Sequence, residues 1–294
     1  MTFFTELHSS FRQGSMLRKL LYLNIGVFIV VRLGMIILKL CALDSIEWIS
    51  YLELPANLHT LALRPWTLAS YMFLHIDFLH ILFNMLCLFG FGQLFLHCFS
   101  QKQLLGIYIF GGIGGALVYV VAFNIFPFFI PIKDISVLLG ASASIMAIIV
   151  AVATYSPNFE VPLLLIGRVK LKYVAIFAVG ISMLGIASDN AGGELAHLGG
   201  ALTGFWFARR IHMGKDITKQ FNQLINKIIT LFERKPKSFK VTKPSRSKND
   251  MEYRQERRKN EDELNRILDK VKRSGYGSLT TEEKKSLFDR SNPS

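Results

Sequence analysis

Residues 140–152 read GASASIMAIIVAV, and residues 195–207 read LAHLGGALTGFWF. Each stretch is an apolar run with a side chain near its start that could carry chemistry, Ser142 in the first and His197 in the second. Polar side chains are costly in lipid, so an intramembrane serine or histidine indicates a functional site. We therefore expect both runs to be membrane helices that bring Ser142 and His197 to one centre.

A third apolar run, residues 78–97, also has polar side chains near its start. It carries His80-x-x-x-Asn84 in its opening turns. Residues four apart lie on one face of a helix, so His80 and Asn84 are expected to point the same way. The pattern is also compatible with a polar pair that only ties helices together.

The composition supports a membrane protein. The chain is 51% hydrophobic with mean hydropathy +0.35, yet it carries 34 basic and 21 acidic residues. The charges are segregated, since 23 of the basic and 12 of the acidic residues lie in 209–294. A basic tail could indicate nucleic-acid binding. We expect no nucleic-acid partner, because this tail lacks a stacking-aromatic module and directly follows a membrane segment, where the positive-inside rule explains its charge.

A membrane-spanning helix needs roughly 20 mostly apolar residues. Candidate spans occur at Leu20–Leu43, Phe78–His97, Leu104–Phe126, Gly140–Tyr155, Leu171–Ala187 and Leu195–Phe207. The last three are short, as expected for helices shielded by neighbours. We therefore predict an all-α membrane protein with a six-transmembrane-helix bundle and a short helical cytoplasmic tail.

The loops predict the orientation. Basic residues precede the first span and follow the second, fourth and sixth, which places both termini in the cytoplasm. The second, fourth and sixth spans then run inward, so all four polar residues lie at similar shallow depth below the outer surface. The first 19 residues show no cleavable signal pattern, and the run that follows is expected to be a permanent span. Arg32, in the middle of that span, is expected to face protein or a water pocket.

The expected organisation has five segments. They are a cytoplasmic N-terminal segment (1–19), the membrane domain (20–212), an amphipathic juxtamembrane helix (213–233), a basic linker (234–250) and a small helical hairpin (251–294). In the hairpin, Thr280-x-x-Glu283 predicts a capping box at the start of its last helix. The partner of this tail is unknown. Cys41, Cys87 and Cys98 show no metal-ligand spacing and no disulfide framework.

The ordered motifs His80-x-x-x-Asn84, Gly140-x-Ser142 and Ala196-His197-x-x-Gly200-x-x-x-Gly204 resemble those of rhomboid intramembrane serine proteases. The resemblance covers about residues 20–210. It implies a six-helix rhomboid-like bundle, a Ser-His dyad and hydrolysis of transmembrane protein substrates near the outer leaflet, with no metal or other cofactor.

Chemistry assigns the roles within this resemblance. Ser142 would be the nucleophile, because a serine hydroxyl becomes reactive beside a base, and His197 would be that base and later the acid. His80, Asn84 and the Ser142 backbone N–H would form the oxyanion hole. A packing role for Ser142 stays open from this residue alone. The resemblance implies a dyad, although Asp189 and Glu194 stand near His197 and could supply a third member.

Other residues near the motifs have expected structural roles. Ser144 lies about 200° further round the helix than Ser142 and is expected to pack. His75 is expected to bond loop backbone. Ala143 and Met146 depart from the family pattern, which usually has glycine after the serine and often an aromatic four positions after it. We expect these two departures to affect the rate or the substrate specificity of cleavage.

Two alternatives to an intramembrane endopeptidase remain. A non-proteolytic rhomboid-like scaffold would bind client transmembrane helices, but its mark would be loss of the serine or histidine, and both are present. A transporter predicts internal repeats, and none is visible. The expected location is multi-pass in the lipid bilayer of a bacterial inner membrane, with the active site opening to the outer side.

Overall fold

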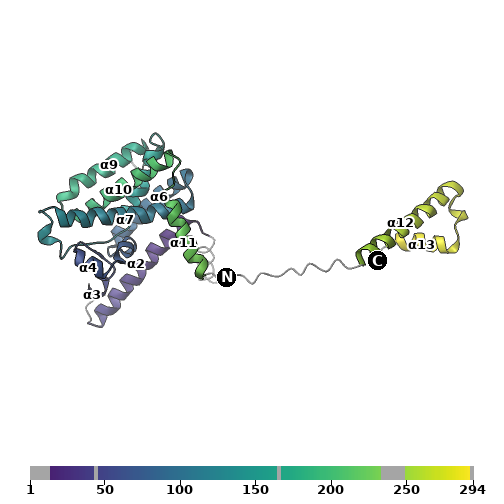
Figure 1. The fold of residues 1–294 in the computed structure, drawn as a ribbon, viewed down its shortest axis with the longest axis horizontal. Helices are drawn as coiled ribbons and strands as arrows, with labels where there is room; N and C mark the ends of the chain where they lie inside the picture. Colours follow the sequence, from purple (N-terminus) through teal and green to yellow (C-terminus); the bar gives the residue numbers. More distant parts are fainter. Residues whose placement is uncertain (1–13, 43–45, 164–166, 233–248, 292–294) are drawn as a thin grey trace. The chain divides into compact units, whose positions relative to one another are not determined.

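The structure is a computed structural model that describes residues 14–42, 46–163, 167–232 and 249–291 (Figure 1). These residues form two compact units, which divide between residues 232 and 233. Both units are predominantly helical. The first contains all the apolar runs, and the second is the tail.

Among the described residues, the first unit has seven long helices, and all but the last follow the predicted apolar runs. They are α2 (Met16–Leu40), α6 (Phe78–Cys98), α7 (Gln101–Ile125), α8 (Ser142–Tyr155), α9 (Leu171–Leu184), α10 (Ala191–His212) and α11 (Thr218–Phe232). Short helices occupy the connections: α3 (Ile46–Ile49), α4 (Leu58–Leu63), α5 (Thr67–Ser70), η1 (Tyr71–Phe73), η2 (Ile130–Ile132) and η3 (Gly185–Ala187).

Two small antiparallel ladders join the loops. Strand β1 (Leu54–Pro55) pairs with β2 (Val137–Leu138) in the register Leu54 to Leu138, which ties the loop after α2 to the segment before α8. Strand β3 (Glu160–Leu163) pairs with β4 (Gly167–Lys170) in the connection between α8 and α9. The first ladder thereby fixes where the chain enters α8.

Side-chain caps set the starts of α6 and α7. The Asp77 carboxylate accepts the His80 N–H at 2.9 Å, and this bond places His80 in the first turn of α6. Ser100 and Gln103 form a reciprocal capping box at the start of α7. Such caps satisfy backbone donors that have no partner inside the helix.

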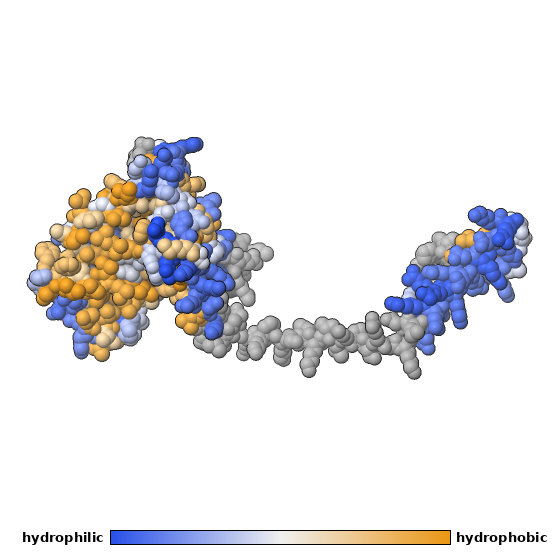
Figure 2. Space-filling view, turned by 45° about the horizontal axis from the view of Figure 1, so that its top comes forward, coloured by the Kyte–Doolittle hydropathy of each residue, from blue (hydrophilic) through white to orange (hydrophobic). Residues whose placement is uncertain are grey.

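Three helices, α2, α6 and α7, are long and apolar enough to cross a membrane. Helices α8 and α9 are apolar but shorter, and α10 carries Arg209 and Arg210 in its last turn. The outer face of this unit is rich in exposed large apolar side chains, as expected for a surface that contacts lipid (Figure 2). The chain is thus an integral membrane protein, while the predicted number of six spans remains a prediction.

Helix α8 lies at the centre of the unit, and α10 packs most extensively against α8 and α7. A Cβ at Gly200 would meet the carbonyl oxygen of Ala143, and one at Gly204 would meet that of Ala147. The two glycines therefore let the α10 backbone lie directly on α8, as the Gly-x-x-x-Gly spacing predicts.

The same two residues of α8, Ala143 and Ala147, also pack on α7 by close approach at glycine. Gly111 of α7 faces the Ala147 methyl group, and a Cβ at Gly115 would lie 2.6 Å from the Cβ of Ala143. Almost every residue of α8 is buried as a result. A helix enclosed by other helices need not match the thickness of the bilayer, which explains why α8 is short.

A buried polar contact joins α2 to α7. The amide of Asn24 donates to the Tyr108 hydroxyl at 3.1 Å, and that hydroxyl donates to the Met72 carbonyl at 2.9 Å. Arg32, in contrast, is exposed on α2. Of the two environments expected for Arg32, contact with protein is therefore wrong for the described residues, because the buried face of α2 is narrow and Arg32 lies outside it. The other, a water pocket, stays a prediction.

Helix α11 lies within the predicted juxtamembrane segment. It packs against α7, where the rings of Phe221 and Phe110 are 5.3 Å apart and Gln103 donates to Asp216 at 3.0 Å. The predicted linker, apart from its last two residues, lies outside the described residues.

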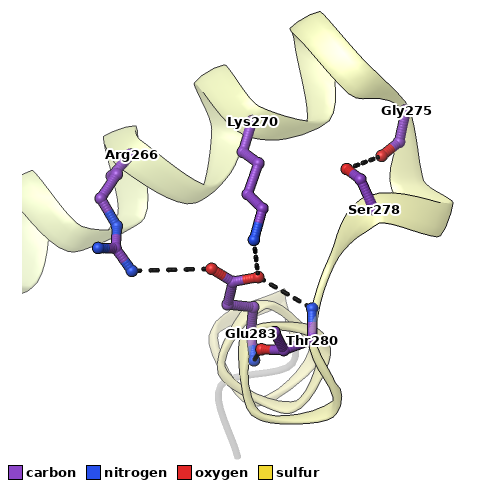
Figure 3. A network of polar contacts seen from close by, with 6 residues as sticks. All are labelled: Arg266, Lys270, Gly275, Ser278, Thr280 and Glu283. Atoms are coloured by element: carbon purple, nitrogen blue, oxygen red, sulfur yellow. Dashed lines mark hydrogen bonds and ion pairs between the residues drawn. The ribbon is translucent and has the colours of Figure 1, made fainter.

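The second unit is a helical hairpin made of α12 (Asn249–Ser274), η4 (Tyr276–Ser278) and α13 (Thr281–Ser291). Its centre is Glu283, which accepts from Lys270 at 2.8 Å and from the Thr280 N–H at 2.9 Å (Figure 3). Thr280 in turn accepts the Glu283 N–H at 3.3 Å, so the predicted capping box is confirmed. The hydrogen bond from Lys270 is the main cause that lowers the pKa of Glu283.

Candidate active site

Two bonds hold the backbone immediately before Ser142. The Gly140 N–H donates to the Tyr71 carbonyl at 2.9 Å, and the Ala141 N–H donates to Nε2 of His75 at 3.3 Å. Helix α8 begins at Ser142, so the Ser142 N–H belongs to a first turn that lacks intrahelical acceptors. This N–H is available to a ligand beside the hydroxyl.

The bonding of His75 identifies its tautomer. Its Nε2 accepts from Ala141, so Nδ1 carries the proton, which faces the Phe73 carbonyl at 3.4 Å. Burial in the loop before α6 lowers the pKa of His75 to about 4, and His80 nearby contributes. The expected structural role of His75 thus corresponds to a neutral ring that ties the start of α8 to the preceding loop.

Gly140 brings His80 close to the same backbone. Its φ is +117°, a conformation that side chains rarely adopt. A Cβ at this position would lie 2.8 Å from Cε1 and 2.9 Å from Nε2 of His80. The imidazole ring therefore rests against the glycine two residues before Ser142.

His80 and Asn84 share one face of α6. The side-chain amide of Asn84 donates to the His80 carbonyl at 3.0 Å, and the His75 and His80 rings meet edge to face with centroids 5.2 Å apart. The second amide hydrogen of Asn84 remains for another acceptor.

His197 is held at its Nδ1 atom by two groups. Glu194 Oε2 and Ser182 Oγ each lie 3.1 Å from this nitrogen. Sequence reasoning favoured a dyad without Glu194 and did not consider Ser182. The spacing of Glu194 and His197, one helical turn apart, was a usable signal. Ser182 had none, because it comes from α9.

Ser142, His197, His80 and Asn84 line a single cavity of about 1020 Å³. It lies where α6, α8 and α10 begin, and Ser142 is half-buried in its wall. Apolar side chains make up much of the remaining wall, among them Phe83, Tyr119, Phe123, Phe128, Phe129 and Met146. The structure thus brings all four predicted site residues together.

The neighbours of Ser142 on α8 face elsewhere. Ser144 is fully buried toward α7, and a Cβ at Gly112 would lie 3.0 Å from its hydroxyl. The Ala143 methyl group faces Gly115 of α7, so the additional carbon relative to the family pattern does not line the cavity. Met146 does line it.

Two side chains, those of Trp66 and Arg64, tie together the segment between α2 and α6. Trp66 Nε1 donates to the Tyr51 carbonyl at 2.7 Å, and Arg64 donates to the Ser50 carbonyl at 3.0 Å. The Arg64 guanidinium also lies 3.9 Å from the centre of the Tyr51 ring. As for metals, the part of the chain that the structure describes contains no cluster of three or more His, Cys, Asp or Glu residues that could hold an ion.

Comparison with known proteins identifies the family. A family model described as "Rhomboid domain" matches residues 62–213, which is more than half of the chain and includes all four site residues. The chain belongs to the rhomboid family. A second model, described as a family of unknown function (DUF6576), matches residues 248–292, the tail of this rhomboid protein.

Two curated relatives show the extent of the similarity. The rhomboid chain is 29% identical over 150 residues to "Presenilin-associated rhomboid-like protein A, mitochondrial" of Danio rerio, covering 49% of this chain and 36% of the relative. It is 30% identical over 161 residues to "RHOMBOID-like protein 12, mitochondrial" of Arabidopsis thaliana, covering 52% and 48%. The chain thus spans between about a third and a half of these relatives.

Proposed function

We propose that this rhomboid protein is an intramembrane serine endopeptidase that cleaves transmembrane protein substrates through a Ser142–His197 dyad. The observation that carries the proposal is that Ser142, His197, His80 and Asn84, from three helices, line one cavity. Family membership supports the same activity.

In the proposed reaction, Nε2 of His197 removes the Ser142 proton as Oγ attacks the peptide carbonyl. The resulting imidazolium then protonates the leaving amine, and an acyl-enzyme remains on Ser142. Water from the outer side hydrolyses the ester with His197 again acting as base. The engagement of Nδ1 by Glu194 and Ser182 leaves Nε2 as the nitrogen for this role.

The negative charge on the tetrahedral oxygen needs nearby donors. The Ser142 N–H, the His80 ring and the free hydrogen of the Asn84 amide are the proposed donors. The first turn of α8 adds the positive end of its helix dipole. No step requires a metal or another cofactor.

The surroundings suggest the substrate class. A cavity lined by both polar groups and aromatic side chains suits an apolar segment whose backbone is locally unwound. Substrates would reach it from the lipid bilayer. We place the cavity on the outer side of a bacterial inner membrane, with both termini cytoplasmic, although the names of both relatives include the word mitochondrial.

Purified chain in detergent, offered a transmembrane substrate, tests the proposal. Ser142→Ala and His197→Ala should each abolish cleavage, and a fluorophosphonate should label the wild type and not Ser142→Ala. Ser144→Ala is the matched control, because the Ser144 hydroxyl is buried and has no hydrogen-bond partner among the described residues. Cleavage by Ser142→Ala would refute the dyad. Absence of labelling and cleavage in the wild type would favour a non-proteolytic scaffold that binds client helices.

A further inference from the structure

We propose that Glu194 is a positioning residue that holds His197 in the tautomer required of a general base, so that the site works as Ser142–His197–Glu194. This inference rests on the proposed function. It goes beyond the dyad, because it assigns a role to a carboxylate that touches neither the substrate nor the nucleophile.

The first observation is the contact itself. Glu194 lies one turn before His197 on α10, and its Oε2 is 3.1 Å from His197 Nδ1. The two side chains are only 16% and 20% exposed. A shielded carboxylate–imidazole bond of this length is stronger than the same pair in water.

The second observation is that the absence of a side chain at Gly185 leaves room for the Glu194 side chain. A Cβ at Gly185 would lie 2.8 Å from Cγ and 3.0 Å from Cδ of Glu194. Gly185 follows Ser182 by three residues at the end of α9, and Ser182 also reaches His197 Nδ1. The end of α9 therefore confines the carboxylate on one side while His197 holds it on the other.

The chemistry of the two partners of Nδ1 differs. A serine hydroxyl can donate or accept, so Ser182 alone is compatible with a proton on either ring nitrogen. An ionised carboxylate can only accept. Glu194 therefore requires the proton on Nδ1, and this leaves the Nε2 lone pair free to take the Ser142 proton.

A structural explanation competes with this role. An acidic residue in the first turn of a helix interacts favourably with the helix dipole, and Glu194 is in the first turn of α10. That interaction would stabilise α10 whatever the state of His197. The two roles are separated by measuring kcat, KM, thermal stability and the position of the histidine proton.

The experiment compares Glu194→Gln and Glu194→Ala with the wild type in detergent. We expect kcat to fall about tenfold or more with KM nearly unchanged, because a carboxylate that orients a catalytic histidine acts on the chemical step. Ser182→Ala should lose much less, since the carboxylate remains. Glu160→Gln, on β3 at the other end of α8, controls for loss of a negative charge.

Nitrogen-15 spectra of histidine-labelled protein give the direct readout, with His197→Ala identifying the relevant signals. The wild type should show His197 protonated at Nδ1, and Glu194→Ala should move proton population to Nε2. The inference is overturned if both Glu194 variants keep wild-type kcat, if the tautomer does not change, or if Ser182→Ala is the more damaging change. The dyad is tested separately, because its failure would appear as cleavage by Ser142→Ala.

Discussion

Gly140 controls the approach of His80 to the nucleophile. Its positive φ and its contact with the His80 ring both exclude a side chain. The Cβ of an alanine would either push the imidazole away or rotate the peptide that precedes Ser142. Both movements would change the proposed oxyanion site. Position 140 therefore requires glycine.

We predict that Gly140→Ala reduces cleavage by more than tenfold and lowers the free energy of unfolding by about 1–3 kcal/mol, the usual cost of a strained backbone position. Activity in detergent and a thermal melt measure the two effects. Gly180→Ala on α9 is the matched control, because nothing lies within 4 Å of a Cβ there. Wild-type activity of Gly140→Ala would show that the His80 contact is dispensable.

His75 makes stability depend on pH. Its pKa is lowered to about 4 in the fold, mainly by burial, whereas an unfolded histidine titrates near 6.5. The neutral ring therefore contributes its full stability above pH 6.5, and this contribution is lost as pH falls from 6.5 toward 4. His80, in edge contact with His75, adds to the effect.

We predict that the contribution of His75 to the free energy of unfolding falls by about 2 kcal/mol when the pH is lowered from 7.5 to 5. His75→Gln, which keeps an acceptor for the Ala141 N–H but does not titrate, should show a correspondingly shallower dependence. Denaturation of both proteins in detergent at several pH values provides the measurement. Equal slopes for the two proteins would contradict the assignment of a neutral buried ring.

At the scale of elements, α8 is a short helix that packs closely on both α7 and α10 at glycines of these two helices. Contacts of backbone on backbone bring Ser142 and His197 to the same cavity, because each helix has little freedom to slide or rotate. In lipid, such packing replaces the hydrophobic driving force that operates in water.

We predict that Gly200→Ala destabilises the protein by about 1–3 kcal/mol, since the new methyl group would meet the Ala143 carbonyl oxygen and separate α10 from α8. Cleavage should fall as well, because His197 lies on the displaced helix. Gly90→Ala on α6 has open space around the new Cβ and should be neutral or stabilising by up to about 1 kcal/mol. Thermal melts of the two variants compare them directly; equal stability would show that α10 adapts without cost.

At the scale of the whole molecule, the chain divides into a membrane unit and a tail unit, each with its own internal contacts. Every residue that lines the cavity belongs to the membrane unit. The tail hairpin is organised around Glu283 and a capping box of its own. The candidate active site and the tail hairpin therefore belong to separate units of the chain.

We predict that a chain ending at Phe232 cleaves a transmembrane substrate in detergent with kcat/KM within about twofold of the full chain, because separate units fold on their own cores. Its melting temperature should match that of the membrane unit in the full protein. A loss of activity that adding the tail in trans restores would contradict this independence and assign the tail a direct part in catalysis.

Much of this architecture can be predicted from residues that are close together in the sequence. Apolar runs predict their helices because burial in lipid depends on composition and length, and the opening turns of three runs identify His80, Asn84, Ser142 and His197 as a set. The Thr280–Glu283 capping box is equally local. Each of these features depends on residues within a few positions of one another.

Contacts between distant segments could not be obtained in this way. Ser182 reaches His197 from α9, Gly185 at the end of α9 lies against Glu194, and His75 reaches the backbone before Ser142 across 66 positions. The exposure of Arg32 is likewise decided by which face of α2 packs. Such contacts depend on how each helix is rotated about its axis. That rotation is set by the packing of all neighbours at once, and it brings Ser182 to Nδ1 of His197.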